Sequence, residues 1–117
     1  MGLIDDAGLP RVLPITYAVL GDFVVTAVDH KRKNVPAERL ARVRWLSRRP
    51  KATITVDHYD DDWSRLAWVQ MIGSVRTVEV DAQLLAALAA RYHQYEARPP
   101  DGPLLVLAAE RLVWWRA

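Results

Sequence analysis

The amino-terminal quarter of the chain has the alternation of apolar and polar positions that is typical of β-strands. From Arg11 to Val19, every second residue after Val12 is apolar, as expected for a strand with one buried face. The pair Gly21-Asp22 then precedes an apolar run from Phe23 to Val28, so the two segments predict a β-hairpin. An earlier fragment, Leu3-Ile4, is joined to them by a turn-forming sequence at residues 5–8 and predicts part of another strand.

The region after residue 35 changes to a helical pattern. Pro36 suits the first turn of a helix, and apolar residues recur every three positions behind it, at Leu40, Val43 and Leu46. Arg48 and Arg49 provide the basic residues that are favoured in the last turn of a helix, and Pro50 predicts the end of this helix. The β-branched residues between Ala52 and His58 then predict a strand that leads into an acidic loop.

The last third of the chain predicts two further strands with a helix between them. Leu66 to Val80 has strand composition, and Gly73 in its middle predicts a bulge or a sharp bend. Asp81 predicts the N-cap of a helix, and a final strand runs from Leu104 toward Trp115. The apolar stripe of this helix has helical spacing and consists of Leu84, Leu85, Leu88, Tyr92 and Tyr95.

These elements have the order β-β-β-α-β-β-α-β, and most strands are near neighbours along the chain. We therefore expect a mainly β, α+β fold, in which an antiparallel barrel or strongly curled sheet is covered by two helices. The 117 residues suit one domain, residues 1–117.

Charge is separated along the chain. The net charge is +2, yet residues 31–51 contain nine basic side chains and a single acidic one. The remaining residues have an acidic excess, so the sequence predicts one anion-binding flank. The chain has no cysteine, which excludes disulfides and thiolate metal sites. No apolar run is long enough to cross a bilayer and no leader precedes the first strand, so we expect a cytoplasmic protein that does not enter membranes.

The basic triplet Lys31, Arg32 and Lys33 is the first candidate for chemistry. It leaves a predicted strand and meets the start of a predicted helix, where unpaired N–H groups also attract anions. The triplet is therefore either a phosphate site or a solvated basic turn.

Other polar and aromatic groups are weaker candidates. Asp57, His58 and the run 60–62 contain possible metal ligands, but they lack the glycine turn of a hard-ion loop, so a solvated acidic loop without metal is expected. Ser64 and Ser74 do not lie at a strand-to-helix elbow, which disfavours nucleophilic catalysis. Trp114 and Trp115 are expected to pack against the final strand or a dimer interface.

Three linked stretches resemble a known family. They are PRVLPITYAV at residues 10–19, FVVTAVDHKRK at residues 23–33, and PKATITVDHYDDDWSRLAWVQMIGSV at residues 50–75. Together they resemble the flavin-binding split β-barrel proteins related to pyridoxamine 5'-phosphate oxidase, over nearly the whole chain. Within that superfamily, VDHYDDDWSRLAWV at residues 56–69 is most similar to the group that depends on the deazaflavin coenzyme F-420.

The resemblance implies a homodimer with F-420, or alternatively FMN, in each of two grooves at the subunit interface. It implies an oxidoreductase that transfers hydride between this cofactor and a small organic substrate, and it identifies no catalytic residue. By position, Arg11 and Thr16 match the cofactor-contacting strand, and Lys31, Arg32 and Lys33 match the phosphate-binding stretch. Trp63, with His58 and Tyr59, matches the wall of the pocket.

The chain departs from the family pattern at two places. The family's amino-terminal helix and part of its first strand are expected to be missing, and Ala27 stands where many oxidases have a hydroxyl. A non-catalytic FMN or deazaflavin carrier is therefore the alternative to an enzyme. The basic helix face with Arg39, Arg42 and Arg49 suits an acidic polyglutamyl tail, which favours the deazaflavin. Nucleic-acid binding is disfavoured because four of the five tryptophans lie outside the basic segment.

Overall fold

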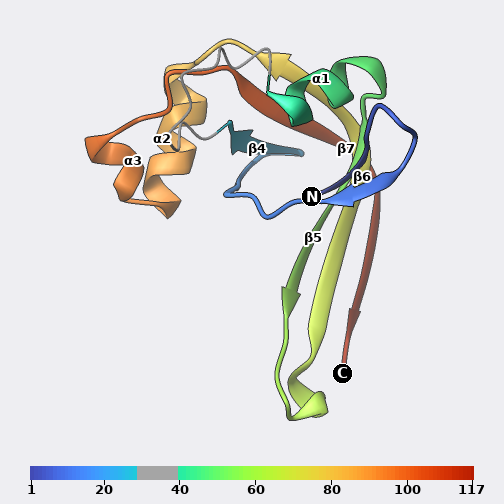
Figure 1. The fold of residues 1–117 in the computed structure, drawn as a ribbon. Helices are drawn as coiled ribbons and strands as arrows, with labels where there is room; N and C mark the ends of the chain where they lie inside the picture. The colour runs from blue at the N-terminus through green and yellow to red at the C-terminus, as the bar shows by residue number, and fades with distance from the viewer. Residues whose placement is uncertain (29–39) are drawn as a thin grey trace.

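A computed structural model describes residues 1–28 and 40–117 of the protein (Figure 1). Its strands and helices, in chain order, are β1 (Gly2–Ile4), β2 (Pro10–Val12), β3 (Ala18–Leu20), β4 (Phe23–Ala27), α1 (Ala41–Arg48), β5 (Lys51–His58), the 3-10 helix η2 (Trp63–Arg65), β6 (Ala67–Val78), α2 (Ala82–Arg91), α3 (Gln94–Ala97) and β7 (Leu104–Arg116).

The strands form a single curled sheet in the order β2-β1-β5-β6-β7-β4-β3. All of its neighbouring pairs are antiparallel, which confirms the predicted arrangement of the sheet. The sheet bends so that β1–β2 and β3–β4 lie at its two edges, while the long strands β5, β6 and β7 form its centre. None of the helices in the described part of the chain has the length and apolar character needed to span a bilayer.

The β3–β4 hairpin is confirmed, but the strand expected from Arg11 to Val19 is broken. A two-residue turn joins Leu20 to Phe23, and Gly21 within it has a φ of 60°, which glycine adopts without strain. Residues 13–17 separate β2 from β3 instead of continuing a strand. Pro14 accounts for part of this break, because proline has no N–H to donate to a ladder.

The two predicted helical regions are present, and the second one is divided. Asp81 caps α2 as expected, since its carboxylate accepts hydrogen bonds from the backbone N–H groups of Gln83 and Leu84. The predicted stripe to Tyr95 is wrong as one helix, because the chain becomes extended at Tyr92 and restarts in α3. This break brings the hydroxyls of Tyr92 and Tyr95 into hydrogen bonds with residues 16 and 17.

Gly73 marks a register shift in the sheet, as the sequence predicted. The β6–β7 pairing shifts between Ile72 and Gly73, so that Glu110 is the extra residue of a bulge. A Cβ at Gly73 would lie 1.9 Å from the carbonyl oxygen of Ala108. The close approach of the two strands at this bend therefore requires glycine.

Two apolar clusters fill the two sides of the sheet above the bulge. The interior cluster lies inside the curl and is covered by α1; its buried members include Leu3, Val24, Leu46, Ile54, Val75, Leu105 and Leu107. The outer cluster lies beneath α2 and α3; its buried members are Ala18, Val25, Ala27, Leu88, Leu104 and Val106. In this globular part, each face of the sheet is therefore covered by segments of the same chain (Figure 1).

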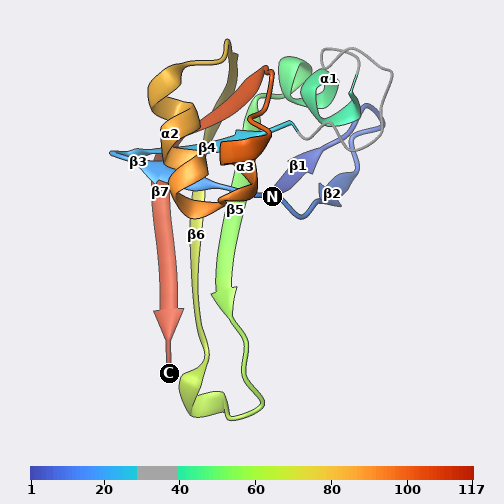
Figure 2. The same ribbon diagram turned by 90° about the vertical axis from the view of Figure 1, so that its left-hand side faces the viewer.

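Below the bulge, the three central strands continue as a long arm (Figure 2). We define the arm as residues 55–72 and 111–116. β1 pairs with β5 only at Thr53, and β4 pairs with β7 only as far as Ala108. Among the described residues, both edges of the arm are therefore unpaired, and its three strands extend away from both helical layers.

The arm has large apolar side chains on both faces. Residues directly opposite each other in antiparallel strands share a face, so Val69 and Trp114 lie on one face and Trp68 and Trp115 on the other. The first face continues the interior cluster through Val56 and Met71. Trp114 is 64% exposed and Trp115 44% exposed. A sheet with apolar groups on both sides is typical of one that is covered on both sides.

Candidate functional site

An open groove lies where the arm leaves the globular part. Its volume is ≈ 960 Å³, and its walls come from the start of the chain and from strands β5 and β6. Ligand pockets usually have volumes of roughly 300–1,000 Å³. The lining residues are Met1, Gly2, Val12, Leu13, Pro14, Thr53, Thr55, Asp57, Trp68 and Gln70.

Three features of the fold create this groove. β1 pairs with β5 at Gly2 and Thr53, and β5 continues beyond this pair along the arm. Val12, Leu13 and Pro14 form one wall, since Pro14 turns the chain away from the sheet. Thr55 and Gln70 are direct cross-strand partners and share the opposite wall with Trp68. The groove therefore offers apolar and indole surface together with an amide, two hydroxyls and the Asp57 carboxylate.

Arg11, predicted to contact a cofactor, lies on the other side of β2 from Val12. Its guanidinium is 3.4 Å from a carboxylate oxygen of Asp5 and lies 4.9 Å from the centre of the Trp45 ring. Because neighbouring strand residues point to opposite faces, Arg11 faces α1 while Val12 faces the groove. In the subunit, Arg11 therefore packs the β1–β2 hairpin against α1.

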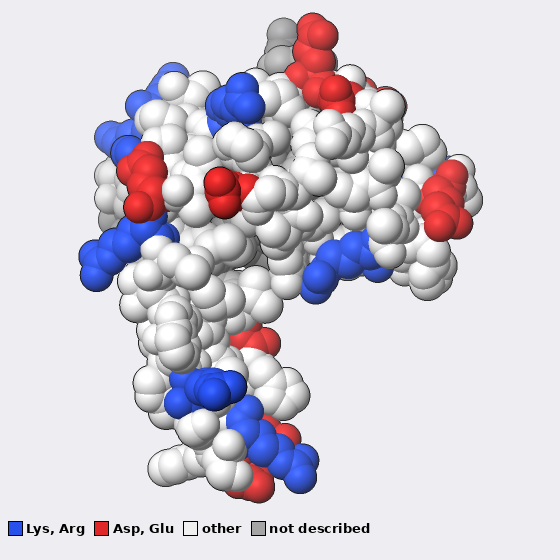
Figure 3. Space-filling view, turned by 180° about the vertical axis from the view of Figure 1, so that it is seen from behind, with Lys and Arg blue, Asp and Glu red and all other residues white. Residues whose placement is uncertain are grey.

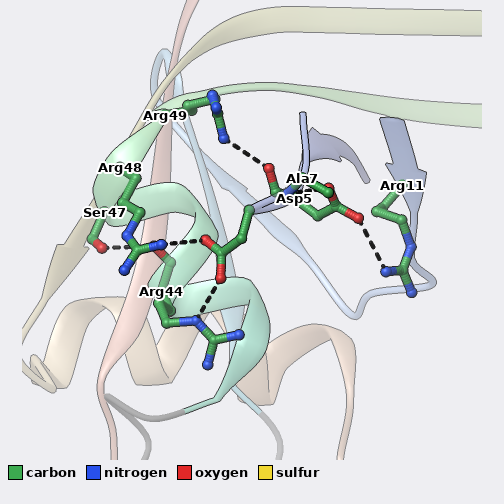
Figure 4. Close-up of polar contacts among 8 residues, drawn as sticks. Asp5, Ala7, Arg11, Arg44, Ser47, Arg48 and Arg49 are labelled. Carbon is green, nitrogen blue, oxygen red and sulfur yellow. Dashed lines mark hydrogen bonds and ion pairs between the residues drawn. The ribbon is translucent and has the colours of Figure 1, made fainter. Parts of the chain in front are cut away.

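The β1–β2 turn also binds the basic face of α1 (Figure 4). The Asp6 carboxylate accepts a hydrogen bond from Arg44 Nε at 2.9 Å and from Arg48 Nη1 at 2.8 Å. Arg49 Nη1 donates to the carbonyl oxygen of Asp5 at 2.7 Å. Much of the positive charge predicted for this helix is therefore occupied within the subunit.

Asp5 organises this turn through its own carboxylate. One of its oxygens accepts hydrogen bonds from the backbone N–H groups of Ala7 and Leu9, both at 2.9 Å. The bond from Leu9, followed by those from Ala7 and Arg11, holds the pKa of Asp5 below its ordinary value, against the opposing effect of its burial. The charged form of Asp5 therefore stabilises the turn that presents Asp6 to α1.

Thr16, the second predicted contact residue, is joined to α3. Its hydroxyl lies 2.8 Å from the Tyr95 hydroxyl. The next residue is held in the same way, since the backbone N–H of Tyr17 donates to the Tyr92 hydroxyl at 3.1 Å. These two bonds fix the segment that continues from the groove wall.

The predicted phosphate triplet, Lys31, Arg32 and Lys33, lies outside the described residues. The strand that leads toward it, β4, ends at Ala27. Thr26 in this strand is 1% exposed, and its Oγ1 has no hydrogen-bond partner among the described residues. Buried hydroxyls usually have a hydrogen-bond partner. Because no described residue pairs with it, the Thr26 hydroxyl is available to a ligand at the end of the strand that leads to the predicted phosphate site.

Trp63 lies at the tip of the arm and does not line the groove of its own subunit. It begins η2 and is 75% exposed, and Tyr59 beside it is 72% exposed. The groove extends along the arm as far as Asp57 and Trp68, and Trp63 lies beyond these residues at the tip of the arm.

The acidic residues of the tip are used in local contacts. Asp62 accepts hydrogen bonds from the backbone N–H and the hydroxyl of Ser64, at 3.1 and 2.7 Å. The hydroxyl bond is the main reason that the pKa of Asp62 lies below its ordinary value. Arg65 lies 3.6 Å from Asp60 and 3.7 Å from Asp62. Within the described parts of the chain, no group of three or more histidine, aspartate or glutamate side chains is arranged to hold a metal ion.

Sequence reasoning missed Thr55, Trp68 and Gln70, which form a wall of the groove. The strand register that brings Thr55 opposite Gln70 depends on pairing between distant segments, and no local pattern reports it. The sequence contains one weak indication that Trp68 has a role in binding. It is a large aromatic residue on a strand whose other face already carries apolar residues.

The fold matches that of several solved structures. A haem-binding protein from Mycobacterium smegmatis has a TM-score of 0.76 at 22% identity, over 97% of this chain and 46% of that chain. An FAD-binding protein from Mesorhizobium loti has a TM-score of 0.69 at 15% identity, over 97% of this chain and 80% of that one. The haem storage protein HutZ from Vibrio cholerae has a TM-score of 0.70 at 15% identity, over 98% and 82%.

The chain has a split β-barrel fold. Its antiparallel sheet and covering helices agree with those of the structures above, and the predicted α+β class is confirmed. The chain spans less than half the length of the M. smegmatis protein. No protein-family model and no curated protein matches the sequence.

Proposed function

We propose that the protein binds a flavin-type cofactor in the groove and that two copies of the chain complete this site. The deazaflavin F-420 is the preferred cofactor and FMN the alternative, as the resemblance of residues 56–69 implies. The observation that carries the proposal is the groove itself, because its wall at Val12–Pro14 belongs to the segment that resembles the family's cofactor-contacting strand. The FAD-binding protein from M. loti, which has the same fold, supports this class of ligand.

The side chains of the groove suit a flat, polar-edged ring system. Trp68 and Val12 offer surface for the ring, and the Gln70 amide and the Thr55 hydroxyl both donate and accept hydrogen bonds at its edge. The anionic tail would be held by Lys31, Arg32 and Lys33, and the unpaired Thr26 hydroxyl lies in the strand that leads to them.

When bound, a reduced cofactor of this type would supply a hydride for an electrophilic carbon of a small organic substrate, with the accompanying proton taken from water. The chain's own groups bind and orient the ring and exclude water from one side of it. No described residue is assigned a proton-transfer role. The reaction class is an F-420- or FMN-dependent oxidoreduction.

A second copy of the chain would cover the arm and close the groove. Trp68 and Gln70 lie on the face of the arm that also bears Trp115, so a subunit packed on this face would contact the same surface as the ligand. Trp63 of the partner would approach the groove from the tip of the partner's arm. The homodimer therefore belongs to the proposed site.

Arg39, Arg42 and Arg49 are proposed to favour the acidic tail of F-420. Arg42 has no hydrogen bond or ion pair among the described residues, whereas Arg49 already donates to Asp5. Reversing Arg39 and Arg42 to glutamate should weaken the binding of F-420 more than that of FMN. Equal losses for the two cofactors would contradict this preference.

The proposal is tested by titrating the purified protein with F-420, FMN and haemin while recording visible spectra. Saturable binding of F-420 or FMN is expected, and haemin is included because two proteins with this fold bind or store haem. Binding followed by oxidation of the reduced cofactor in the presence of substrates identifies an enzyme. Binding without turnover identifies a carrier, the alternative function.

A matched pair of variants locates the site. Gln70→Leu should weaken flavin binding about tenfold, because one hydrogen bond is worth about 1.4 kcal/mol in such a site. Gln83→Leu, on the exposed side of α2, should leave the affinity unchanged. Equal flavin affinities for the two variants would show that the flavin does not bind in the groove beside Gln70.

A further inference from the structure

Arg91, Tyr17 and Tyr92 form a hydrogen-bonded cluster at the carboxyl end of α2. Arg91 Nη2 donates to the Tyr17 hydroxyl oxygen at 3.0 Å, and Arg91 Nε donates to the Tyr92 hydroxyl oxygen at 3.2 Å. The Arg91 guanidinium also lies 4.2 Å from the centre of the Tyr17 ring and 5.7 Å from that of Tyr92. Both tyrosines therefore hold one guanidinium in a fixed position.

The hydrogen-bonding capacity of this cluster is only partly used. The Tyr92 oxygen accepts from Arg91 and from the backbone N–H of Tyr17, and the Tyr17 oxygen accepts from Arg91. Both hydroxyls act as acceptors, so each retains a hydrogen to donate. Arg91 uses two of its five N–H groups. The cluster thus presents further donors and no further acceptor of comparable strength.

The positive charge of Arg91 is not neutralised within the described residues. Arg91 is exposed and takes part in none of their ion pairs, whereas Arg44, Arg48 and Arg65 all pair with aspartates. Its hydrogen bond to Tyr92 is the main reason that its pKa lies above its ordinary value. A permanently charged, fixed guanidinium beside two hydroxyl donors is the composition of an oxyanion site.

The cluster lies at the carboxyl end of α2. Figures 1 and 2 show that α2 ends at the lower edge of the globular part, on the side from which the arm extends. Figure 3 shows the recess, with basic side chains at this edge. Tyr17 follows Pro14 of the groove wall by three residues, a span of at most ~10 Å.

A purely structural role does not account for Arg91. The segment before β3 is already joined to the helices by the bond from Tyr17 N to Tyr92 and by the contact of Thr16 with Tyr95. These contacts do not involve the guanidinium. The edge-to-face packing of Tyr92 and Tyr95, with ring centres 5.9 Å apart, adds to this attachment.

We propose that Arg91, with the hydroxyls of Tyr17 and Tyr92, binds the carboxylate or phosphate group of a small molecule in this recess. The group is either the anionic end of a substrate or, in place of the site predicted at residues 31–33, the tail of the cofactor. The proposal goes beyond the flavin-type function and does not depend on it, because the three donors are fixed in the cofactor-free subunit.

The experiment is an NMR titration of the cofactor-free protein with inorganic phosphate, with sodium chloride at matched ionic strength as the reference. The amides of residues 16–18 and 91–93 and the Arg91 Nε–H are expected to shift and saturate. Arg91→Gln should weaken phosphate binding at least tenfold, and Tyr17→Phe, which keeps the ring and removes one donor, should weaken it less. Arg98→Gln, an exposed arginine after α3, is the matched control and should bind as the unmodified chain does.

The backbone spectra of the variants show whether each remains folded. Shifts that do not saturate, or equal phosphate binding by Arg91→Gln and the unmodified chain, would overturn the proposal. Repeating the titration with FMN and with phosphate-free riboflavin then separates the two sources. If FMN displaces phosphate and riboflavin does not, the site binds the tail of the cofactor. If phosphate still binds to the flavin-loaded protein, the site binds a substrate.

Discussion

The globular part and the arm are built from the same three strands, yet they bury their side chains differently. Above the bulge at Gly73, the sheet lies between the interior cluster and the outer cluster, and Leu88, Leu104 and Leu105 are 0% exposed. Below it, Leu112 is 59% and Trp114 64% exposed. The described residues cover both faces of the globular sheet and leave both faces of the arm largely exposed.

This difference indicates where the chain depends on a second copy. An exposed apolar sheet with unpaired edges associates readily with other surfaces. A symmetric dimer would bury one arm against the other and convert two such surfaces into one interface. The same packing would close the groove. Dimerisation would therefore both stabilise the arm and complete the site.

The largest effect is expected from a charge placed on the arm, because the exposed face of the arm is proposed to form the dimer interface. Trp115→Glu, on the face of the arm that carries Trp68, should weaken the dimer about 100-fold, because removing one large buried aromatic costs about 3 kcal/mol at an interface. Leu9→Glu, at a residue that is 58% exposed in the β1–β2 turn, is the matched control. Sedimentation velocity over a dilution series measures both, and equal effects would show that Trp115 lies outside the interface.

The junction between the two regions can be tested at Gly73. Gly73→Ala should lower the free energy of unfolding by about 2 kcal/mol, since the added Cβ meets the backbone of Ala108. Gly2→Ala is the control, because its nearest neighbours would lie at 3.9 and 4.0 Å. Urea unfolding measures the difference. Similar midpoints for the two variants would mean that the bulge does not require a glycine.

The globular part should lose a local contribution to its stability in acid. The pKa of Asp5 is lower in the folded chain than in the unfolded one, so its contribution is complete above the unfolded pKa, about 4. The contribution disappears as the pH falls through the folded pKa. Asp5→Asn should therefore be less stable than the unmodified chain at pH 7 and equally stable in strong acid. A stability difference that does not change with pH would contradict this assignment.

The smallest effect is expected for the exposed ion pairs of the turn. Asp6→Asn removes the contacts of Asp6 with Arg44 and Arg48, both on the surface of α1. Such pairs contribute less than about 1 kcal/mol, so thermal unfolding should change little. A loss as large as that for Gly73→Ala would show that the turn, and not the sheet, limits the stability of the globular part.

Most of the fold was predictable from local patterns. The Gly21 turn, the Gly73 bulge and the Asp81 cap each depend on a few adjacent residues, and all three were confirmed. The break at residues 13–17 and the division of the helix at Tyr92 were not predicted. In both, contacts between distant segments compete with the local preference, as Tyr92 and Tyr95 do with residues 16 and 17.

The site was less accessible to sequence reasoning. The orientation of Arg11 toward α1 follows from the pairing of β1 with β2, and the use of Arg44 and Arg48 follows from the position of Asp6. The local density of positive charge near residues 31–51 predicted an anion-binding flank, but did not reveal that acidic residues of the first turn occupy part of it. The cluster of Arg91 with Tyr17 was equally invisible, because 74 residues separate the two.

The most direct test of the shared site is the mass of the unmodified protein in solution, measured by sedimentation equilibrium at micromolar concentration with and without F-420. The account predicts a particle of twice 13.3 kDa, bound to one cofactor for each chain. A particle of 13.3 kDa that binds the cofactor with the same affinity would contradict it, because one subunit would then form the groove alone.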